Sequence, residues 1–367
     1  MPTSKTIDTL FQKVQEVGAS DIHIIVGKPP LMRLDGKIMP LAEGEEEKAE
    51  LSREEVQDLV DSVLTETQRE RYVREREIDL SYQLSSGTRL RVNCHFERDN
   101  PGLVARIIPE AIPTMEEIFL PEVTQNIISA HQGIVLVTGP TGSGKSTSLA
   151  AMIETINKEK PLHIVTLEDP IEFLYHSKEA AIRQRQLGTD FLSFEEALRR
   201  ILRQDPDVIM VGEMRDLETI AAALTMAETG HLVFGTLHTN NAAQTIDRII
   251  DVFPPHQQSQ IRTQLSMTLQ AVIGQRLVPK RGGGRVAVRE VLLNSTAVAN
   301  IIRDNRVAEL HNVIQTSASE GMITIERDIA RLLSMGLIDR EVAEEYVRDP
   351  ELLKDIKVEG NKKGWFK

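Results

Sequence analysis

A phosphate-binding loop is the strongest chemical signal in the sequence. Residues 139–146 read Gly-Pro-Thr-Gly-Ser-Gly-Lys-Ser and match the pattern GxxxxGK[ST] in full. In this pattern the glycines let backbone N–H groups turn toward a phosphate, and the lysine and hydroxyl that follow complete the site. We expect Lys145 to reach the β- and γ-phosphates of ATP and Ser146 to ligate Mg²⁺. The predicted nucleotide-binding residues are Gly139, Pro140, Thr141, Gly142, Ser143, Gly144, Lys145, Ser146 and Thr147.

Three further polar groups each follow an apolar run of strand type. Glu168 follows residues 163–167, Glu213 follows residues 208–211, and His238 follows residues 232–236. In a parallel α/β sheet ligands bind at the carboxyl ends of the strands, so these side chains are expected to face one γ-phosphate. We predict Glu213 as a Mg²⁺ ligand acting through the water shell, as in a Walker-B strand, and Glu168 as the general base. His238 is the predicted γ-phosphate sensor.

Four neighbouring residues are secondary candidates. Asp169 and Glu172 extend the acidic group, although Asp169 is also suited to capping the turn before Pro170. Arg215 follows Glu213, and His231 precedes the fourth apolar run. His231 and His238 lie seven residues apart on one strand, so their side chains point to opposite faces and do not suit a shared metal. We interpret His231 as a structural or intersubunit hydrogen-bonding residue.

The elements that must position these residues are those of a two-domain α/β protein. Continuous apolar strands at 133–138, 163–167, 208–211 and 232–236 alternate with helices, including one expected over 147–155, which is typical of a buried parallel sheet. Before them lies a smaller mixed α/β domain. It contains a helix over 7–17, a hairpin turning at 35–36, a charged loop over 43–50, a capped helix from Ser52, and strands near 78–84, 89–96 and 103–108. The predicted limits are a domain over 1–108, a linker over 109–117, an ATPase core over 118–293 and a helical region over 294–367.

Composition restricts the classes of partner. The net charge is −12 and aromatic residues make up 4%, which disfavours nucleic acid as a partner. Cys94 is the single cysteine, so an intrachain disulfide or a multi-cysteine metal site is excluded and a reducing, cytoplasmic location is favoured. The sequence has no signal-peptide pattern and no apolar run long enough to span a membrane, so we expect no direct membrane insertion.

The ordered motifs resemble those of the secretion superfamily ATPases. That superfamily is known for a Walker A box, an acidic box, a Walker B box and a histidine box, similar to residues 139–146, 168–172, 211–216 and 229–240. Within it the chain resembles the PilT family of type IV pilus retraction ATPases, through residues 18–23, Pro29-Pro30 and residues 33–36. Assembly and secretion ATPases usually carry a longer N-terminal region and a four-cysteine zinc element, which this chain does not have.

The resemblance implies a hexameric motor that hydrolyses ATP to retract a pilus and drive twitching motility. A PAS-like N-terminal domain would pack on the RecA-like domain of the neighbouring subunit, and nucleotide-driven motion would be taken up by the linker. It also implies that Arg91 and Arg106 reach the nucleotide, and that an inner-membrane pilus platform protein holds the cytoplasmic ring at the membrane.

One segment departs from the family pattern. The family's AIRNLIRE segment corresponds to residues 297–304, where Ala299 stands in place of the first arginine while Asn300 and Arg303 remain. A divergent accessory retraction ATPase is therefore an alternative, as is a pilus assembly or type II secretion ATPase. Outside these classes, a RecA-like nucleic-acid translocase and a regulatory nucleotide-binding protein share the same loop.

Overall fold

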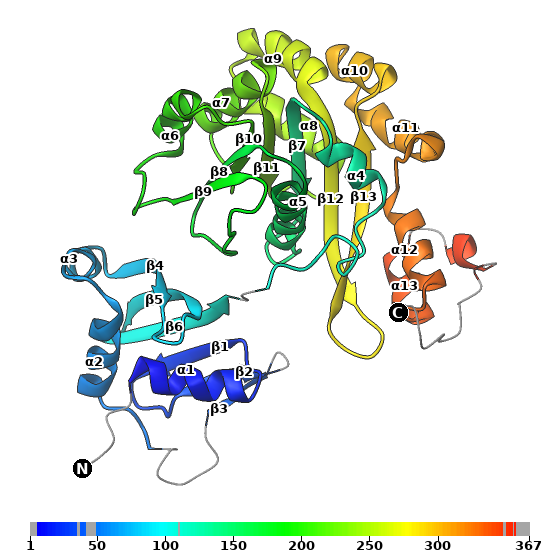
Figure 1. The fold of residues 1–367 in the computed structure, drawn as a ribbon. Coiled ribbons are helices and arrows are strands. Elements are labelled where there is room, and N and C mark those ends of the chain that lie inside the picture. Colours follow the sequence, from blue (N-terminus) through cyan, green and yellow to red (C-terminus); the bar gives the residue numbers. More distant parts are fainter. Residues whose placement is uncertain are drawn as a thin grey trace. The chain divides into compact units, whose positions relative to one another are not determined.

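The chain divides into two compact units, each with its own sheet. The computed structural model describes residues 6–34, 37–41, 49–108, 111–347, 350–354 and 356. The first unit comprises residues 1–111 with 170–174, and the second comprises residues 112–169 with 175–367 (Figure 1). The predicted hairpin turn at 35–36, residues 43–48 of the charged loop and linker residues 109–110 lie outside the described residues.

The first unit is built on an antiparallel six-stranded sheet with the order β3-β2-β1-β6-β5-β4. Its elements are α1 (Ile7–Glu16), β1 (Asp21–Ile25), β2 (Leu31–Leu34), β3 (Lys37–Pro40), α2 (Arg53–Val63), α3 (Glu66–Glu75), β4 (Glu77–Gln83), β5 (Arg89–Glu97) and β6 (Asn100–Ile108). The predicted helices and strands are confirmed, whereas α3 was not predicted. Ser52 and Glu55 form the predicted capping box, in which each side chain accepts a hydrogen bond from the other residue's backbone N–H.

Alternation along β5 separates the core of the first unit from its outer face. Leu90, Val92 and Cys94 are buried in the core, and Arg91 between them is exposed. The same alternation places Arg106 on the outer face of β6, directly opposite Arg91 in the strand register.

The second unit contains a seven-stranded sheet with the order β13-β12-β7-β11-β10-β8-β9. All neighbours pair in parallel except the edge strand β13, which is antiparallel to β12. The strands are β7 (Gly133–Thr138), β8 (His163–Glu168), β9 (Ala181–Gln186), β10 (Val208–Val211), β11 (Leu232–Leu237), β12 (Leu269–Pro279) and β13 (Arg285–Leu293). The four predicted strands are thus confirmed as the adjacent central strands β7, β11, β10 and β8.

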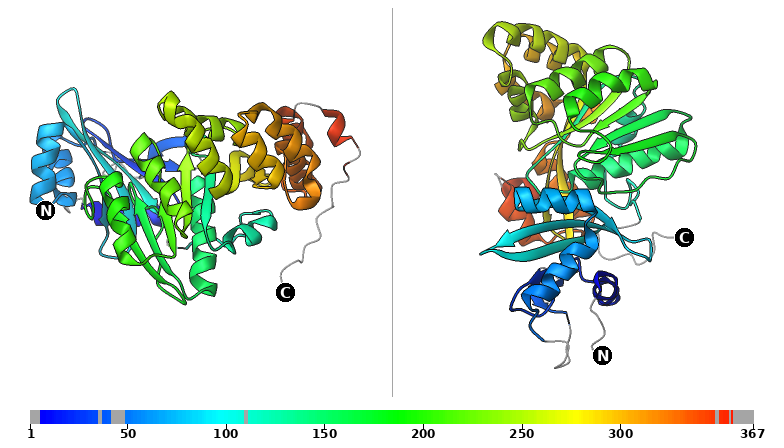
Figure 2. Two further views of the ribbon diagram at one scale, coloured as in Figure 1. Left: turned by 90° about the horizontal axis from the view of Figure 1, so that it is seen from above. Right: turned by 90° about the vertical axis from the view of Figure 1, so that its left-hand side faces the viewer.

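Helices cover both faces of this sheet. The helices of the unit are α4 (Val123–Ile128), α5 (Lys145–Glu159), α6 (Phe194–Ile201), α7 (Leu217–Glu228), α8 (Ala242–Asp251), α9 (Pro255–Thr268), α10 (Thr296–Arg303), α11 (Leu310–Thr316), α12 (Ile325–Ser334) and α13 (Arg340–Tyr346). Short 3₁₀ turns occupy Leu202–Gln204, Val307–Glu309, Ala318–Glu320 and Pro350–Leu353. Helix α5 lies on one face, and α7, α8 and α9 lie on the other, where they bury Ile134 and Leu136 of β7 (Figures 1 and 2).

The parallel register brings the carboxyl ends of the central strands to one edge of the sheet. Thr138 at the end of β7 pairs with Leu237 at the end of β11, and Val211 at the end of β10 pairs with both Leu167 and Gly235. The residues that follow these strands therefore emerge side by side. Among the described residues no helix has the length and apolar character needed to cross a bilayer.

Candidate active site

The phosphate-binding loop connects β7 to α5 and requires glycine at its first position. Gly139 has φ +147°, and a Cβ added there would lie 2.2 Å from the carbonyl oxygen of Gln275 on β12, so a larger residue would not fit. Helix α5 begins at Lys145, whose Nζ donates hydrogen bonds to the carbonyls of Gly139 at 2.8 Å and Pro140 at 3.1 Å. The loop therefore closes around its own lysine at the N-terminus of a 15-residue helix, which favours bound anions.

His238 joins three of the predicted motifs into one group. Its Nε2 lies 3.0 Å from Glu213 Oε1, and its Nδ1 lies 3.4 Å from the Thr141 hydroxyl oxygen of the phosphate-binding loop. With the proton on Nε2, the imidazole donates to Glu213 and accepts from Thr141, so both contacts are satisfied by one neutral tautomer. The residues that follow β10 and β11 are thus connected through side chains to the loop that follows β7.

Glu213 is held as a carboxylate. Its Oε2 accepts a hydrogen bond from Arg215 Nη2 at 2.6 Å. Burial alone would raise the pKa of Glu213, but the hydrogen bond and charge of Arg215, together with the hydrogen bond from His238, lower it below its usual value of 4.5. The hydrogen bond to Glu213 in turn raises the pKa of Arg215, and the charge of Asp169 adds to that effect. Arg215 is therefore a partner of Glu213, and Asp169 lies close enough to influence Arg215.

Glu168 is buried at the neighbouring strand end, with 6% of its surface exposed. Its Oε1 accepts hydrogen bonds from the Thr166 hydroxyl at 2.6 Å and from Gln184 Nε2 at 3.0 Å, which fix the orientation of the carboxylate. A Cβ added to Gly212 would lie 3.3 Å from Glu168 Cα, so the strand end that leads to Glu213 packs directly against Glu168. Sequence reasoning missed Gln184, because β9 is polar and has no apolar run that would mark it as a strand.

His231 lies at the opposite end of β11 from His238. Its Nδ1 is 3.1 Å from the carbonyl of Met226 and 3.3 Å from the Thr229 hydroxyl, so its contacts are local and structural. The six residues of β11 span about 20 Å, which separates the two histidines. In the described part of the chain no group of three or more His, Cys, Asp or Glu residues is arranged to hold a metal ion.

The remaining predicted residues belong to the first unit. Arg106 Nε donates to Asp21 Oδ1 at 2.6 Å, and this carboxylate is nearly buried with 5% of its side chain exposed. Arg91 Nη1 lies 3.7 Å from Glu172 Oε1, since the segment 170–174 packs with this unit. Both arginine side chains are exposed, at 44% for Arg91 and 66% for Arg106.

The donor set of the second unit suits a Mg²⁺-nucleotide. The hydroxyl oxygens of Thr138 and Ser143 are buried and have no hydrogen-bond partner among the described residues, so polar groups remain to be satisfied beside the loop. Ser146 and Glu213 supply a hydroxyl and a carboxylate, and Mg²⁺ takes few protein ligands because it retains water and binds phosphate oxygens. Residues that could hold the ion through its water shell are therefore present.

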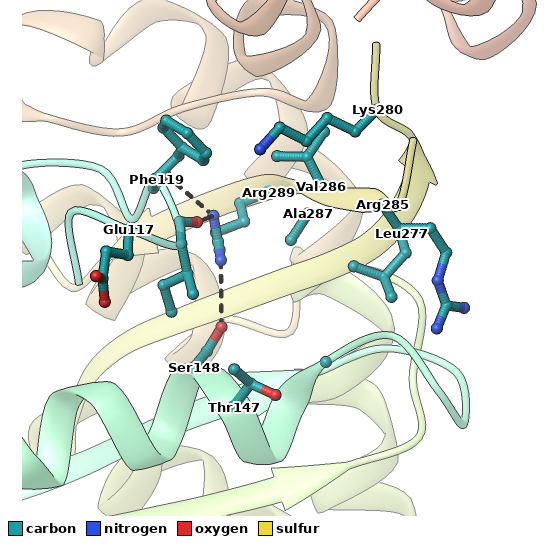
Figure 3. Close-up of a pocket in the computed structure, with 13 residues that line it drawn as sticks. Glu117, Phe119, Thr147, Ser148, Leu277, Lys280, Arg285, Val286, Ala287 and Arg289 are labelled. Carbon is teal, nitrogen blue, oxygen red and sulfur yellow. Dashed lines mark hydrogen bonds between the residues drawn. The ribbon is translucent and has the colours of Figure 1, made fainter. Parts of the chain in front are cut away.

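A pocket of about 430 Å³ lies beside the start of α5. Gly144 and Thr147 line the pocket at the start of the helix. Figure 3 shows Thr147 on one side, with Phe119, Lys280 and Arg289 on the other. Lys280 Nζ lies 5.4 Å from the centre of the Phe119 ring, within cation–π range. The pocket therefore combines an aromatic ring and positive charge next to the phosphate-binding loop.

The fold and the site together define the class of protein, a RecA-type P-loop ATPase. The chain belongs to the type II/IV secretion system protein family, whose model matches residues 1–283. The resemblance to the secretion superfamily that the motifs indicate is thereby confirmed.

Individual relatives extend the match along the chain. The type IV pilus retraction ATPase PilT of Pseudomonas aeruginosa is 47% identical over 334 residues, which cover 91% of this chain and 96% of PilT. The type IV pilus ATPase PilU of the same organism is 41% identical, over 92% of this chain and 87% of PilU. The crystal structure of the pilus retraction motor PilT with bound ADP superposes with a TM-score of 0.86 at 43% identity, covering 95% of this chain and 98% of that one. This agreement confirms the predicted fold of an N-terminal PAS-like α/β domain followed by a RecA-like domain.

Proposed function

We propose that this chain is a subunit of a motor that hydrolyses ATP to retract a type IV pilus and so drive twitching motility. The observation that carries the step from nucleotide binding to hydrolysis is the contact of His238 with both Glu213 and Thr141. The direction of the work, retraction rather than extension, is supported by the similarity to PilT over nearly the full length of both chains.

In this proposal the loop after each central strand supplies a separate function in hydrolysis. Lys145 binds the β- and γ-phosphates, while Ser146 and Glu213 hold Mg²⁺, which when bound neutralises charge on the phosphate oxygens. Glu168, oriented by Thr166 and Gln184, positions the attacking water and accepts its proton. His238 senses the γ-phosphate, because any phosphate contact at Thr141 alters a hydrogen bond that continues to Glu213.

The pocket beside α5 would take the ribose and base of the nucleotide. It borders Gly144 and Thr147, the residues on either side of Lys145 and Ser146, so it continues directly from the phosphate-binding loop. A volume of about 430 Å³ lies within the range of small-molecule sites, about 300–1,000 Å³, and suits a nucleoside.

We further propose that six subunits form a ring and that Arg91 and Arg106 reach the nucleotide from the N-terminal domain. Guanidinium groups arriving on closure would neutralise charge on the γ-phosphate, and the linker over 109–117 would take up the domain motion. ATP binding would favour a closed domain pair and product release an open one. A pilus platform protein would hold the cytoplasmic ring at the inner membrane.

The proposal is tested by whether the motor retracts or extends the pilus. Cells carrying Lys145→Ala are expected to display more surface pili than wild type and no twitching zone, because extension continues while retraction stops. Lys158→Ala, which changes an exposed lysine of the same helix, is the matched control and should twitch normally. Loss of surface pili in the Lys145→Ala strain would instead identify an assembly ATPase.

A divergent accessory retraction ATPase is a second candidate, favoured by two observations. Ala299 on α10 replaces the arginine of the family pattern, and PilU matches 92% of this chain. The two candidates differ when every other retraction ATPase gene is deleted. A main motor still supports twitching in that background, whereas an accessory motor does not.

Two other classes make different biochemical predictions. A nucleic-acid translocase requires turnover that DNA or RNA stimulates in a salt-sensitive way. A regulatory nucleotide-binding protein requires negligible steady-state hydrolysis by the wild-type chain. Steady ATP turnover without stimulation by nucleic acid excludes both.

A further inference from the structure

We propose that Gln275 is a positioning residue of the phosphate-binding loop, held in its working orientation by a buried hydrogen-bond relay through Ser148 and Arg289. The three side chains are almost inaccessible to solvent, with exposed fractions of 2%, 1% and 1%. The inference rests on the proposed function only in taking a nucleotide as the ligand of the loop. It gives β12 and β13, which lie outside the hydrolytic motifs, a role in positioning the phosphate-binding loop.

Gln275 contacts the loop at both of its ends. Its backbone carbonyl oxygen approaches Gly139 so closely that a Cβ there would lie at 2.2 Å. Its side-chain Nε2 donates a hydrogen bond of 2.8 Å to the carbonyl of Ser143. One residue of β12 therefore limits where the loop begins and where it turns into α5.

The bond to Ser143 aims the next backbone N–H. The carbonyl of Ser143 and the N–H of Gly144 belong to one planar trans peptide, so they point in opposite directions. Gly144 is the left-handed residue that precedes α5, with φ +85°. Because Gln275 holds the carbonyl from outside, the N–H of Gly144 is directed into the loop, where a phosphate oxygen would accept it.

The relay has only one possible polarity. Arg289 Nη2 lies 3.3 Å from the Ser148 hydroxyl oxygen, and a guanidinium group can only donate. The Ser148 hydroxyl accepts this hydrogen bond and donates its own proton in a second one, to Gln275 Oε1 at 2.9 Å. With Oε1 engaged there, the amide nitrogen of Gln275 is left to face Ser143. The charge on Arg289 thus selects the amide orientation that the loop needs.

Strand register builds this arrangement. Gln275 and Arg289 are directly paired residues of the antiparallel strands β12 and β13, so their side chains share one face of the sheet. Ser148 reaches that face from the second turn of α5. A slip of one residue between the strands would turn one of the two side chains to the opposite face and break the relay.

The far end of the relay fixes the wall of the pocket. Arg289 Nη1 donates to the carbonyls of Ile118 and Phe119, both at 3.1 Å (Figure 3). Arg331 Nη2 also donates to the Phe119 carbonyl, at 3.1 Å. Phe119 has φ +54°, a strained conformation for an aromatic residue that persists only when its surroundings hold it. The same guanidinium that orients Gln275 therefore also holds the aromatic ring beside the loop.

Burying Arg289 has a cost in stability, which favours a positioning role. Burial lowers the pKa of Arg289 to about 10, although the charge of Asp328 opposes that shift. A buried charge that only filled space would be replaceable by an apolar side chain without loss. A guanidinium that orders three acceptors in fixed directions is not replaceable in that way.

The isosteric change Gln275→Glu tests the relay with the full-length chain. Its carboxylate still accepts from Ser148 but presents an acceptor, not a donor, to the Ser143 carbonyl. Loss of the hydrogen bond to the Ser143 carbonyl, and repulsion between that carbonyl and the new carboxylate, are expected to raise the Kd for ADP about tenfold at neutral pH. The deficit relative to wild type should shrink as pH falls, because a protonated carboxyl group donates again. In steady state KM for ATP should rise while kcat at saturating ATP stays within about threefold.

Controls separate this inference from the proposed function. Gln270→Glu, the same change on the same strand but bonded to Gln132 and away from the loop, should bind ADP as wild type does. If Gln275→Glu binds ADP like wild type at neutral pH, or shows a deficit that pH does not alter, the relay is wrong. If the wild-type chain binds no ADP or ATP, the proposed function fails instead.

Ser148→Ala gives a second test that does not depend on the folding of Gln275→Glu. Alanine is favourable inside a helix, and the change removes only the hydroxyl that links Gln275 to Arg289. Weaker ADP binding is expected, and the double variant with Gln275→Glu should lose less affinity than the two single effects combined, because both break one relay. Unchanged affinity in Ser148→Ala, or independent effects in the double variant, would overturn the proposal.

Discussion

His238, Glu213 and Thr141 come from three motifs far apart in the sequence, yet one imidazole contacts both other side chains. Under the proposed function, this pairing would let a change at the phosphate-binding loop reach the Glu213 carboxylate. At the level of single residues, the proposed hydrolysis therefore depends on Glu213 remaining charged and remaining in contact with His238.

Glu213→Gln removes the charge while keeping the shape of the side chain. We expect turnover to fall by at least about 100-fold, because a preorganised electrostatic group beside the reacting phosphate is lost. ADP binding, measured by fluorescence displacement, should change little. Glu218→Gln, an exposed glutamate five residues further on, is the matched control. Turnover of Glu213→Gln close to that of wild type would remove Glu213 from the site.

The pH dependence of Glu213 has a defined sign. Because its folded pKa lies below the usual 4.5, the carboxylate contributes stability above about pH 4.5 and loses it as pH falls through the lower folded value. Glu213 should therefore stay ionised between pH 7 and pH 5, and any loss of ATPase activity over that range should arise from other groups. The curve of activity against pH should have the same shape for wild type and for Glu218→Gln. A carboxylate signal from residue 213 that titrates above pH 5 in NMR would contradict this.

Cys94 offers a simple test of the first unit's core. Burial raises the pKa of its thiol to about 12, so almost no thiolate is present at neutral pH. The native chain should resist alkylation by iodoacetamide for hours and react at once in denaturant. Rapid alkylation of the native protein would show that β5 is not packed as described.

Among the elements, β12 and β13 carry buried polar groups that hold others in place. Glu290 on β13 is buried, and its Oε1 accepts a hydrogen bond of 2.8 Å from the backbone N–H of Ala242 at the start of α8. That helix follows the histidine box directly, so Glu290 helps to fix where the loop after His238 ends.

Glu290→Gln is expected to stabilise the protein at neutral pH. Burial raises the pKa of Glu290 despite the hydrogen bond from Ala242, so the charged form costs stability above its folded pKa and this cost is relieved as pH falls. Glutamine keeps the acceptor without the charge. The unfolding temperature of the variant should exceed that of wild type at pH 7.5, with the difference narrowing toward pH 4.5; a lower Tm at pH 7.5 would show that the charge itself is required.

The elements also show what the sequence could predict. The four central strands were predictable because each is a continuous apolar run buried on both faces. Strand β9 was missed because it reads Ala-Ile-Arg-Gln-Arg-Gln, and β12 and β13 because Gln275, Arg289 and Glu290 interrupt their apolar pattern. Such residues are buried only because partners distant in the sequence satisfy them, and those partners cannot be identified before the fold is known.

The residues of the candidate site also fall into those that the sequence predicts and those that only the fold reveals. Motif spacing predicted that Glu168, Glu213 and His238 end adjacent strands, since parallel strand ends share one edge. It did not predict Gln184 or Gln275, which act through contacts that only sheet order creates.

For the whole molecule, the proposed function includes a role for Arg91 and Arg106 at the nucleotide. Arg91→Lys keeps the charge but loses the fork geometry, and we expect kcat to fall by about tenfold or more while ADP affinity is unchanged. Glu172→Gln is the control, because it removes the ion pair of Arg91 without altering the guanidinium. Equal losses in the two variants would mean that Arg91 acts only through that ion pair.

The motor claim is tested most directly by the retraction of single, fluorescently labelled pili in cells whose chromosomal gene carries Glu213→Gln. We predict that pili still extend, that retraction events disappear or become rare, and that the Glu218→Gln strain retracts at the wild-type rate. Absence of extended pili in the Glu213→Gln strain, or retraction at the wild-type rate, would contradict it.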